Sequence, residues 1–515
     1  MNNSIKYLIK TILLFAVLSS CSDFLDQKPI NGLVKEEYWQ NKEELHKVMM
    51  GAYSALADMD VQLFLNGEIR GDMLTKGVSI VNCTNSNAYT AGNLRDVMDA
   101  SILSDNKFAM WDNFYKVINL CNHVIVYAPS IQQKDPTLSD YYMQAYISEA
   151  TTLRSLMYFY LVRIYRDVPY IDYPTVNDAV NLYPSKTSGE EILKKILQDL
   201  VTDGIAEKMS DFYGDDISTI GRMNKFASYA LIAEISLWQF NYDLALTYIE
   251  KIENSSKYTL KPNSEWFSLF AKGNTFESIF EIQYDAANSQ SNGLYNLTVN
   301  TASKYFQTSS YVNKLFVEDV YGNRSLESTR KEGTVLWDNG NYKVYKYIGE
   351  TPNRDAIQGY LRSSNAASAN FIVYRYAAIL LMKAEALTQK DVPDFDGALE
   401  LINILRVRAN VPAISSNVFG ISKLAAEEII LEERALELAY EGKRWFDLLR
   451  YARRNNYAQK NTFIAKITEN ASPSQRLIIA SKLNDENSWY LPIYQIEIDN
   501  NINLKQNPYY VGTGS

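Results

Sequence analysis

Two carboxylates four residues apart, Glu437 and Glu441, come closest in type and spacing to an acid–base pair. On a helix, this spacing places both groups on one face. Cleavage of a glycosidic bond by such a pair also needs an open cleft, with a water molecule or a sugar between the groups. Basic residues stand three positions from each carboxylate, at Arg434 and Arg444, and favour intrahelical ion pairs instead. We therefore expect the two carboxylates to have a structural role.

Other catalytic chemistry has few residues to draw on. The two histidines, His46 and His123, each lie in a helical pattern without a second histidine four residues later, so we expect both to be structural. Cys83 and Cys121 either form one disulfide or remain thiols, and both readings stay open. The chain has no nucleophile motif, P-loop, zinc-ligand spacing or glycine-rich dinucleotide fingerprint. We expect a protein that is not an enzyme and that uses no cofactor, and we name no metal ligands.

The N-terminus carries a candidate site of covalent modification at Cys21. Two lysines precede the apolar run 12–18, and two serines stand directly before the cysteine. This arrangement is typical of a secretory signal, because a membrane-spanning helix needs roughly 20 apolar residues. The run Leu18-Ser19-Ser20-Cys21 resembles a bacterial lipobox, which implies that residues 1–20 are removed and Cys21 is acylated. The alternative is a secreted protein with an incidental cysteine.

Composition limits the class of partner. The formal net charge is −9, and 47% of the residues are hydrophobic. An acidic chain without a basic block has no electrostatic footprint for nucleic acid, so we exclude that partner. The 38 tyrosines suit a wet binding surface, since each combines an apolar face with a polar tip, although tyrosine also fills gaps between helices.

The elements that must position these residues are mostly helical. From about residue 34, apolar residues recur at spacings of three and four, and one long helix is expected from about Met143 to Tyr165, ending before Pro169. Two segments, 230–248 and 384–401, repeat a helix-turn-helix pattern in which the second helix carries an aromatic, a small and a bulky residue in turn. This packing is typical of tetratricopeptide repeats. A further helix is expected near 428–452, with acidic and basic residues three apart.

Polar segments interrupt the helices. Residues 254–370 are rich in Ser, Asn, Gly and Tyr, which favours loops and short strands, and a similar break runs from Gly77 to Leu94. The segment from Asp391 to Gly397 has some acids of a calcium loop, but the alternation fails at Val392, so we interpret it as an inter-helix turn. We predict a mainly α fold: a tetratricopeptide-like helical-repeat scaffold (about 34–253 and 371–455) with an irregular loop-rich and short-strand insertion (about 254–370).

Several motifs resemble, over nearly the whole chain, the SusD/RagB family of outer-membrane nutrient-binding lipoproteins. They are Cys21-Ser-Asp-Phe-Leu-Asp26, Glu149-Ala150 with Leu153-Arg154-Ser155-Leu156, Asp167-Val168-Pro169, Asn403 to Pro412, Glu433 to Leu448, and Leu491-Pro492-Ile493 through Pro508. The run from Glu433 to Leu448 is the strongest match. Tyr509 departs from the family's usual glycine, which affects only a local turn. The resemblance places residues 21–515 in one SusD-like domain.

The resemblance implies a cell-surface receptor that is anchored to the outer membrane and delivers its ligand to a SusC-like TonB-dependent transporter. It leaves the ligand open between a glycan and a peptide. Glycan binding needs exposed aromatic faces together with amides, which the loops supply. We predict these ligand contacts: Asn87, Tyr89, Asn93, Tyr295, Trp337 and Tyr342. Ordinary loop packing is the alternative for each of them, and a scaffold that only docks a partner protein is the alternative for the whole chain.

Overall fold

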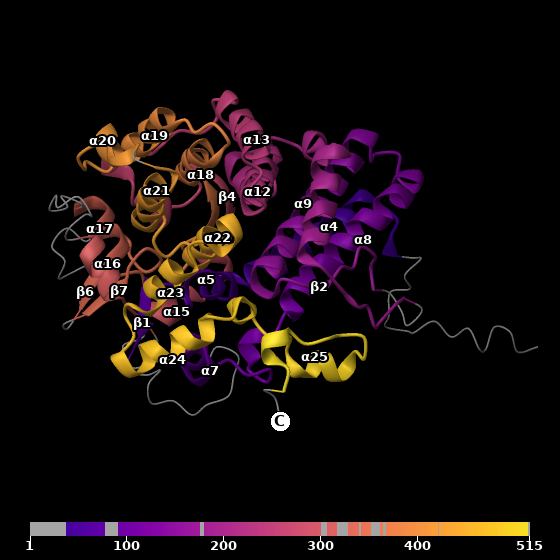
Figure 1. Cartoon of the computed structure of the whole chain (residues 1–515). Helices are drawn as coiled ribbons and strands as arrows, with labels where there is room; N and C mark the ends of the chain where they lie inside the picture. Colours follow the sequence, from indigo (N-terminus) through magenta and orange to yellow (C-terminus); the bar gives the residue numbers. More distant parts are fainter. Residues whose placement is uncertain are drawn as a thin grey trace, which may run out of the picture.

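The computed structural model of this chain describes residues 38–77, 91–175, 180–299, 306–316, 328–338, 341–351, 361–363, 367–420 and 422–512. Cys21, Cys83, Asn87 and Tyr89 lie outside the described residues. Two helical layers dominate, with the N-terminal helices to the right in Figure 1 and the second helical layer at the upper left. None of the helices in the described ranges has the length and apolar character needed to span a bilayer.

The first layer packs long antiparallel helices around an apolar core. Its helices are α4 (Lys42–Ala57), α8 (Asp112–Lys134), α9 (Asp140–Tyr165), α10 (Gly189–Leu197), α11 (Asp216–Ile220), α12 (Lys225–Trp238) and α13 (Tyr242–Asn254). Asn41 and Glu44 form a capping box that fixes the start of α4. The predicted helix 143–165 is confirmed, because α9 ends at Tyr165 and Arg166 takes a φ of 69° before Pro169.

The two predicted repeats are confirmed as helix pairs. Helices α12 and α13 pack together, as do α18 (Tyr376–Gln389) and α19 (Phe395–Arg408), and α13 contacts α18 to join the pairs. Asp394 caps α19 by accepting from the Gly397 amide at 2.9 Å, so the segment 391–397 is the inter-helix turn. The tetratricopeptide-like scaffold is thus present.

The predicted single helix 428–452 is wrong. The chain forms α21 (Lys423–Glu437) and α22 (Arg444–Tyr457), separated by a turn at residues 438–443. Tyr440 and Gly442 reverse the chain there with φ values of 62° and 71°. α23 (Lys460–Thr468) follows α22, and α24 (Pro473–Leu483) and α25 (Gln495–Asn500) lie along the lower edge of Figure 1.

The insertion consists of short elements, as predicted. Its helices are α14 (Ser268–Ala271), α15 (Leu294–Val299), α16 (Ser310–Leu315) and α17 (Ser328–Thr334), and α20 (Ser416–Phe419) lies beyond it. β4 (Ser278–Ile282) pairs antiparallel with β8 (Phe371–Arg375), and β6 (Val335–Asp338) with β7 (Asn341–Val344). β5 (Phe306–Thr308) pairs with β1 (Leu74–Lys76), which follows α5 (Asp60–Glu68), and β2 (Val168–Pro169) pairs with β3 (Lys186–Thr187). The predicted polar break 77–94 ends early, because α7 (Ala91–Met98) begins within it.

Candidate functional site

Four of the predicted ligand contacts lie on elements that touch one another. Asn93 is on α7, Tyr295 is on α15, and Trp337 and Tyr342 are register partners across the β6–β7 hairpin. α7 contacts β1, β1 pairs with β5, β5 contacts β7, and β7 contacts α15. We call this set of elements, α7, β1, β5, β6, β7 and α15, the loop layer; it lies at the lower left and bottom of Figure 1. The six predicted contacts themselves stay a prediction.

Tyr295 has a packed environment. Only 9% of the residue is exposed, and its hydroxyl donates to the Arg362 carbonyl at 2.8 Å. Its backbone amide donates to Asn292 at 3.1 Å, and its ring belongs to a buried cluster with Trp266 and Phe267. This burial favours a role in supporting the loop layer over direct stacking on a ligand.

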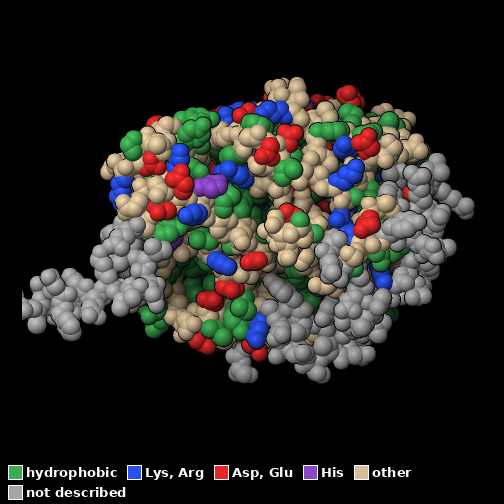
Figure 2. Space-filling view, turned by 180° about the vertical axis from the view of Figure 1, so that it is seen from behind, with side chains coloured by type: hydrophobic (Ala, Val, Ile, Leu, Met, Phe, Trp, Pro, Cys, Tyr) green, Lys and Arg blue, Asp and Glu red, His purple; other side chains and the backbone are tan. Residues whose placement is uncertain are grey.

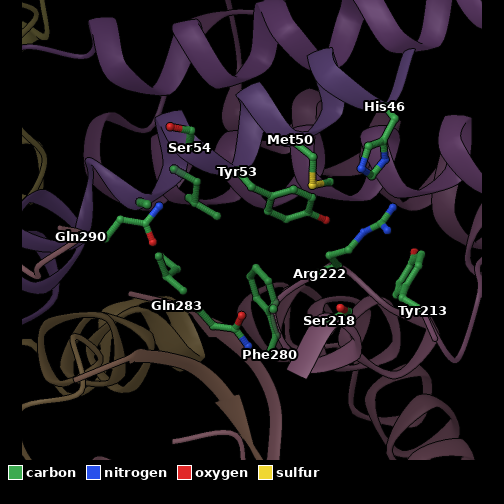
Figure 3. Close-up of a pocket in the computed structure, with 14 residues that line it drawn as sticks. His46, Met50, Tyr53, Ser54, Tyr213, Ser218, Arg222, Phe280, Gln283 and Gln290 are labelled. Carbon is green, nitrogen blue, oxygen red and sulfur yellow. The ribbon is translucent and has the colours of Figure 1, made fainter. Parts of the chain in front are cut away.

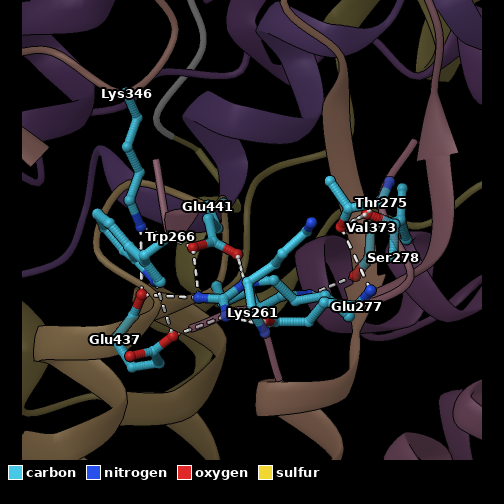
Figure 4. Close-up of polar contacts among 12 residues, drawn as sticks. Lys261, Trp266, Thr275, Glu277, Ser278, Lys346, Val373, Glu437 and Glu441 are labelled. Atoms are coloured by element: carbon cyan, nitrogen blue, oxygen red, sulfur yellow. Dashed lines mark hydrogen bonds and ion pairs between the residues drawn. The ribbon is translucent and has the colours of Figure 1, made fainter. Parts of the chain in front are cut away.

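A buried ionic network ties the insertion to the helical scaffold, and Figure 4 shows Glu277, Glu437, Glu441 and Lys346 among its members. Arg375 lies at its centre, because it pairs with all three of these carboxylates. Its guanidinium donates to Glu277 at 2.8 Å, to Glu437 at 2.7 Å and to Glu441 at 2.9 Å, and all four side chains are fully buried. Lys346 approaches Glu441 at 2.6 Å from the segment after β7. Burial lowers the pKa of Lys346 to about 8, and the Glu441 carboxylate offsets part of this shift.

Further cations neutralise Glu437. Arg330 of α17 approaches its carboxylate at 3.2 Å, Arg408 forms an ion pair with it, and the Trp266 indole donates to it at 3.3 Å. Burial alone would raise the pKa of Glu437, but Arg408, Arg375 and Arg330 hold it well below its usual range. Glu437 and Glu441 therefore lie in a closed network without the open cleft that an acid–base pair requires.

The ion pairs that we predicted within one helix, Arg434 with Glu437 and Glu441 with Arg444, are wrong, because the turn at 438–443 separates two helices. Arg434 pairs with Asp447 at 2.8 Å, and Arg444 pairs with Asp72 at 2.7 Å, because α21 and α22 are separate helices. Asp447 and Arg450, which also stand three residues apart, do form a pair within one helix, at 3.0 Å. The Arg434–Asp447 pair joins α21 to α22, and the Arg444–Asp72 pair joins α22 to a segment far away in the sequence, so both pairs stabilise the tertiary fold.

Glu68 supports the same turn from α5. One carboxyl oxygen accepts from the amide of Gly442 at 2.9 Å and from that of Lys443 at 3.2 Å. The side chain is fully buried, and this burial raises its pKa to about 8. The backbone bonds oppose the shift without cancelling it. Glu68 is therefore protonated in the folded chain at neutral pH.

We expect Glu68→Gln to flatten the pH dependence of stability. The folded chain retains a proton on Glu68 between an unfolded pKa of 4.5 and a folded pKa of about 8, so wild-type stability falls as pH rises through this window. In the E68Q variant, glutamine has nearly the shape of the protonated glutamate but does not titrate. Urea unfolding at pH 5 and pH 8 should show similar stabilities at pH 5 and a more stable variant at pH 8. An equal change of unfolding free energy with pH in both proteins would contradict the raised pKa of Glu68.

A concave feature lies between α4, the segment 210–222 and β4 (Figure 3). Two adjoining cavities of 530 Å³ and 310 Å³ share Tyr213 and Arg222, and we call them together the aromatic groove. Its rings come from α4, α9, the segment 210–222 and β4. They are His46, Tyr53, Tyr141, Tyr142, Tyr146, Phe212, Tyr213 and Phe280.

A salt bridge joins the two halves of the groove. Arg222 binds Glu149 in two places, from Nε to Oε1 at 2.8 Å and from Nη2 to Oε2 at 2.6 Å. The Tyr53 hydroxyl donates to the same carboxylate at 2.7 Å, and the guanidinium lies 3.9 Å from the centre of the Tyr213 ring. Figure 3 shows Tyr53 and Arg222 pointing into the same space. This bidentate pair fixes the walls of the groove with its charges matched.

His46 lies at this groove, on the exposed side of α4. Its Nδ1 is 3.1 Å from the Tyr146 hydroxyl, and desolvation followed by the nearby Arg222 lowers its pKa. The sequence predicts a structural role for His46 and does not indicate a cavity beside it. Residues 46, 50, 53 and 57 fall on one helix face at spacings of four, three and four, and that pattern was the available signal. His123, in contrast, stacks on Trp39 and Tyr127.

The described part of the structure also shows the state of Cys121, the arrangement of possible metal ligands and the charge of one face. Cys121 is a free, buried thiol, and burial raises its pKa to about 12. Within the described ranges, no group of three or more histidine, cysteine or acidic residues is arranged to hold a metal ion. On the described part of the face in Figure 2, acidic and basic side chains are interspersed, so the field of this face is mixed in sign.

Comparisons with known proteins agree on one family. A model described as "SusD family" matches residues 229–510, and one described as "Starch-binding associating with outer membrane" matches residues 23–237. The SusD-like protein P38 of Formosa agariphila is 27% identical and aligns over 87% of this chain and 91% of that protein.

Solved structures share the fold. A laminarin-binding SusD-like protein superposes with a TM-score of 0.68 at 19% identity, covering 91% of this chain and 99% of that one. The surface glycan-binding protein A of Bacteroides uniformis gives a TM-score of 0.69 at 19% identity, covering 91% and 100%.

Proposed function

The chain belongs to the SusD family, and from this membership we propose that it binds a glycan at the bacterial outer membrane and delivers it to a partner TonB-dependent transporter. The family model for residues 23–237, described as starch-binding and associated with the outer membrane, supports this proposal. So do the laminarin-binding and glycan-binding proteins that share the fold. The protein acts as a receptor and releases its ligand unchanged.

The proposal rests on one observation: the helical scaffold supports the loop layer, whose elements contact one another and carry predicted ligand contacts. The register of β6 and β7 places Trp337 opposite Tyr342, and the contacts from α7 to β7 join Asn93 to the same layer. Loops held on a rigid framework are the usual location of binding residues. We assign glycan contact to Trp337, Tyr342 and Asn93, with Asn87 and Tyr89 completing the site and Tyr295 supporting it from beneath.

Isothermal titration calorimetry of the purified protein against oligosaccharide and peptide panels tests this proposal. We expect saturable binding to an oligosaccharide. The W337A/Y342A variant should weaken that binding at least tenfold, because stacking on aromatic faces contributes much of the affinity for sugars. Saturable binding to peptides alone would replace the glycan with a peptide as the ligand.

We also propose that Cys21 carries acyl chains that hold the protein in the outer membrane beside a SusC-like transporter. Anchoring both partners in one membrane raises their effective concentration without a new contact. A single acyl chain binds a membrane only marginally, whereas several chains hold stably.

Cys21→Ala should abolish membrane retention and leave ligand affinity unchanged. Cell fractionation measures the first effect and calorimetry the second. Cys121→Ala is the matched control, because it removes a buried thiol without touching the proposed anchor, and it should remain in the membrane fraction. Membrane retention of C21A, or a loss of affinity in the released protein, would contradict this division of roles.

A further inference from the structure

The aromatic groove is a second saccharide-binding site, we infer, and it accepts a neutral glycan chain. This inference rests on the proposed function and adds a location and a charge preference to it. The groove lies among α4, α9, α11 and β4, whereas Trp337 and Tyr342 lie on β6 and β7 at the opposite side of Figure 1. None of the six predicted ligand contacts lines it within the described residues.

Exposed rings form the outer part of the groove. Tyr141 and Tyr142 are 63% and 60% exposed, and Phe212 on the facing segment is 52% exposed. The two tyrosine rings lie 5.4 Å apart at an angle of 73°, so they present two faces in different directions. Large aromatic rings gathered at one exposed site mark a binding surface more often than isolated ones do. Successive sugars of a bent glycan chain can each stack on one of these faces.

The inner part of the groove is polar but carries no net charge. Glu149 neutralises the Arg222 guanidinium through the bidentate contact. Desolvation, followed by the nearby Arg222, lowers the pKa of His46, which favours its neutral form. Arg222 is the one lysine or arginine among the described residues that line the groove, and its bidentate pair with Glu149 leaves no free cation there for an anionic ligand. The matched charges therefore favour a neutral ligand.

Polar side chains at the inner end can bond sugar hydroxyls. Ser54 and Gln290 both line the cavity and are exposed. In the described part of the chain, neither the Ser54 hydroxyl nor the Gln290 side-chain amide has a hydrogen-bond partner. A hydroxyl and an amide each donate and accept, as sugar hydroxyls do. A wholly apolar ligand would bury these groups without a partner, at a cost in free energy.

The size of the groove also fits this class of ligand. Its cavities of 530 Å³ and 310 Å³ fall within the roughly 300–1,000 Å³ typical of small-molecule sites. The combination of few fixed polar groups with aromatic walls is the usual composition of such sites. A short oligosaccharide can therefore occupy both cavities, with Tyr213 and Arg222 at the junction.

Calorimetry on the full chain tests the inference with defined probes. The neutral probes are laminarihexaose, maltohexaose, mannohexaose and xylohexaose, and the acidic probe is hexagalacturonate. We expect two sites per chain for the neutral probe that binds, and one site after Tyr141→Ala and Tyr142→Ala together. Gln290→Ala should weaken the same site several-fold without removing a ring. Tyr183→Ala is the matched control, because Tyr183 is 52% exposed and lies outside the groove.

The possible outcomes separate the inference from the proposed function. Unchanged stoichiometry in Y141A/Y142A, while W337A/Y342A loses binding, would overturn the second site and leave the receptor function intact. Occupation of the groove by hexagalacturonate or by a peptide would overturn its assignment to neutral glycans. Failure of every neutral and acidic oligosaccharide to bind the wild-type chain would refute the proposed glycan function, and the inference with it. Thermal unfolding of each variant checks that the fold is retained.

Discussion

Arg375→Met is expected to lower the free energy of unfolding by about 3–5 kcal/mol, the usual cost of removing one partner from a buried ion pair. The substitution keeps much of the side-chain length and removes all the bonds to Glu277, Glu437 and Glu441. These carboxylates would remain fully buried with fewer compensating cations. Because Lys346 and Arg330 reach the same network from the insertion, the loop layer should lose its support as well.

Urea unfolding followed by tryptophan fluorescence measures this loss, and the soluble yield reports a variant too unstable to purify. The matched control is Lys314→Met, which removes a cation from the surface pair with Glu469. Exposed pairs contribute roughly 0–1 kcal/mol, so this control should remain close to wild type. Equal stabilities for R375M and K314M would show that the buried network does not support the fold.

Gly67→Ala should produce the other large loss of stability. Gly67 lies in α5 directly against the turn at 438–443, and an added Cβ would overlap the carbonyl group of Gly442. Backbone atoms cannot move aside as the end of a side chain can, so α5 and the turn must separate. Overpacking of a core costs typically about 1–3 kcal/mol, and a clash with backbone belongs at or above the upper end. Separation of α5 from the turn would also weaken the hydrogen bonds that the Gly442 and Lys443 amides donate to Glu68.

Gly51→Ala provides the control for this change. Gly51 also lies within a helix, α4, but apart from its chain neighbours and the backbone of that helix, no atom of the described residues lies within 4 Å of the position where a Cβ would be added. Alanine there should stabilise the helix by about 0.5–1 kcal/mol, because glycine costs that much in a helix interior. Thermal unfolding should therefore shift in opposite directions for the two substitutions. A stable G67A variant would mean that α5 and the turn are not in close contact.

The repeats could be predicted because their information is local. The spacing of aromatic, small and bulky residues in 241–248 and 394–401 corresponds directly to α13 and α19. The turn at 438–443 was missed because the residues on both sides continue a helical charge and apolar pattern. Only the left-handed Tyr440 and Gly442 interrupt it, and tertiary contacts with α5 hold them there. Long-range pairs such as Arg444 with Asp72 leave no local trace in the sequence.

The sites were predictable to different degrees. Loop composition identified the elements that carry Asn93, Trp337 and Tyr342, and the structure brings these elements into contact. The aromatic groove was missed, since its walls come from four segments that are far apart in the chain. Glu149 and Arg222 show the difficulty, because they are separated by 73 positions and meet only when α9 packs beside the segment 210–222.

The most direct test of the receptor function is to titrate a neutral oligosaccharide into the wild-type chain and then recover it for chromatography. The account predicts a saturable heat of binding, a marked loss of that heat in W337A/Y342A, and recovery of the oligosaccharide at its original length. Binding of peptides alone would contradict the glycan ligand. Recovery of shorter oligosaccharides would show that the protein cleaves what it binds.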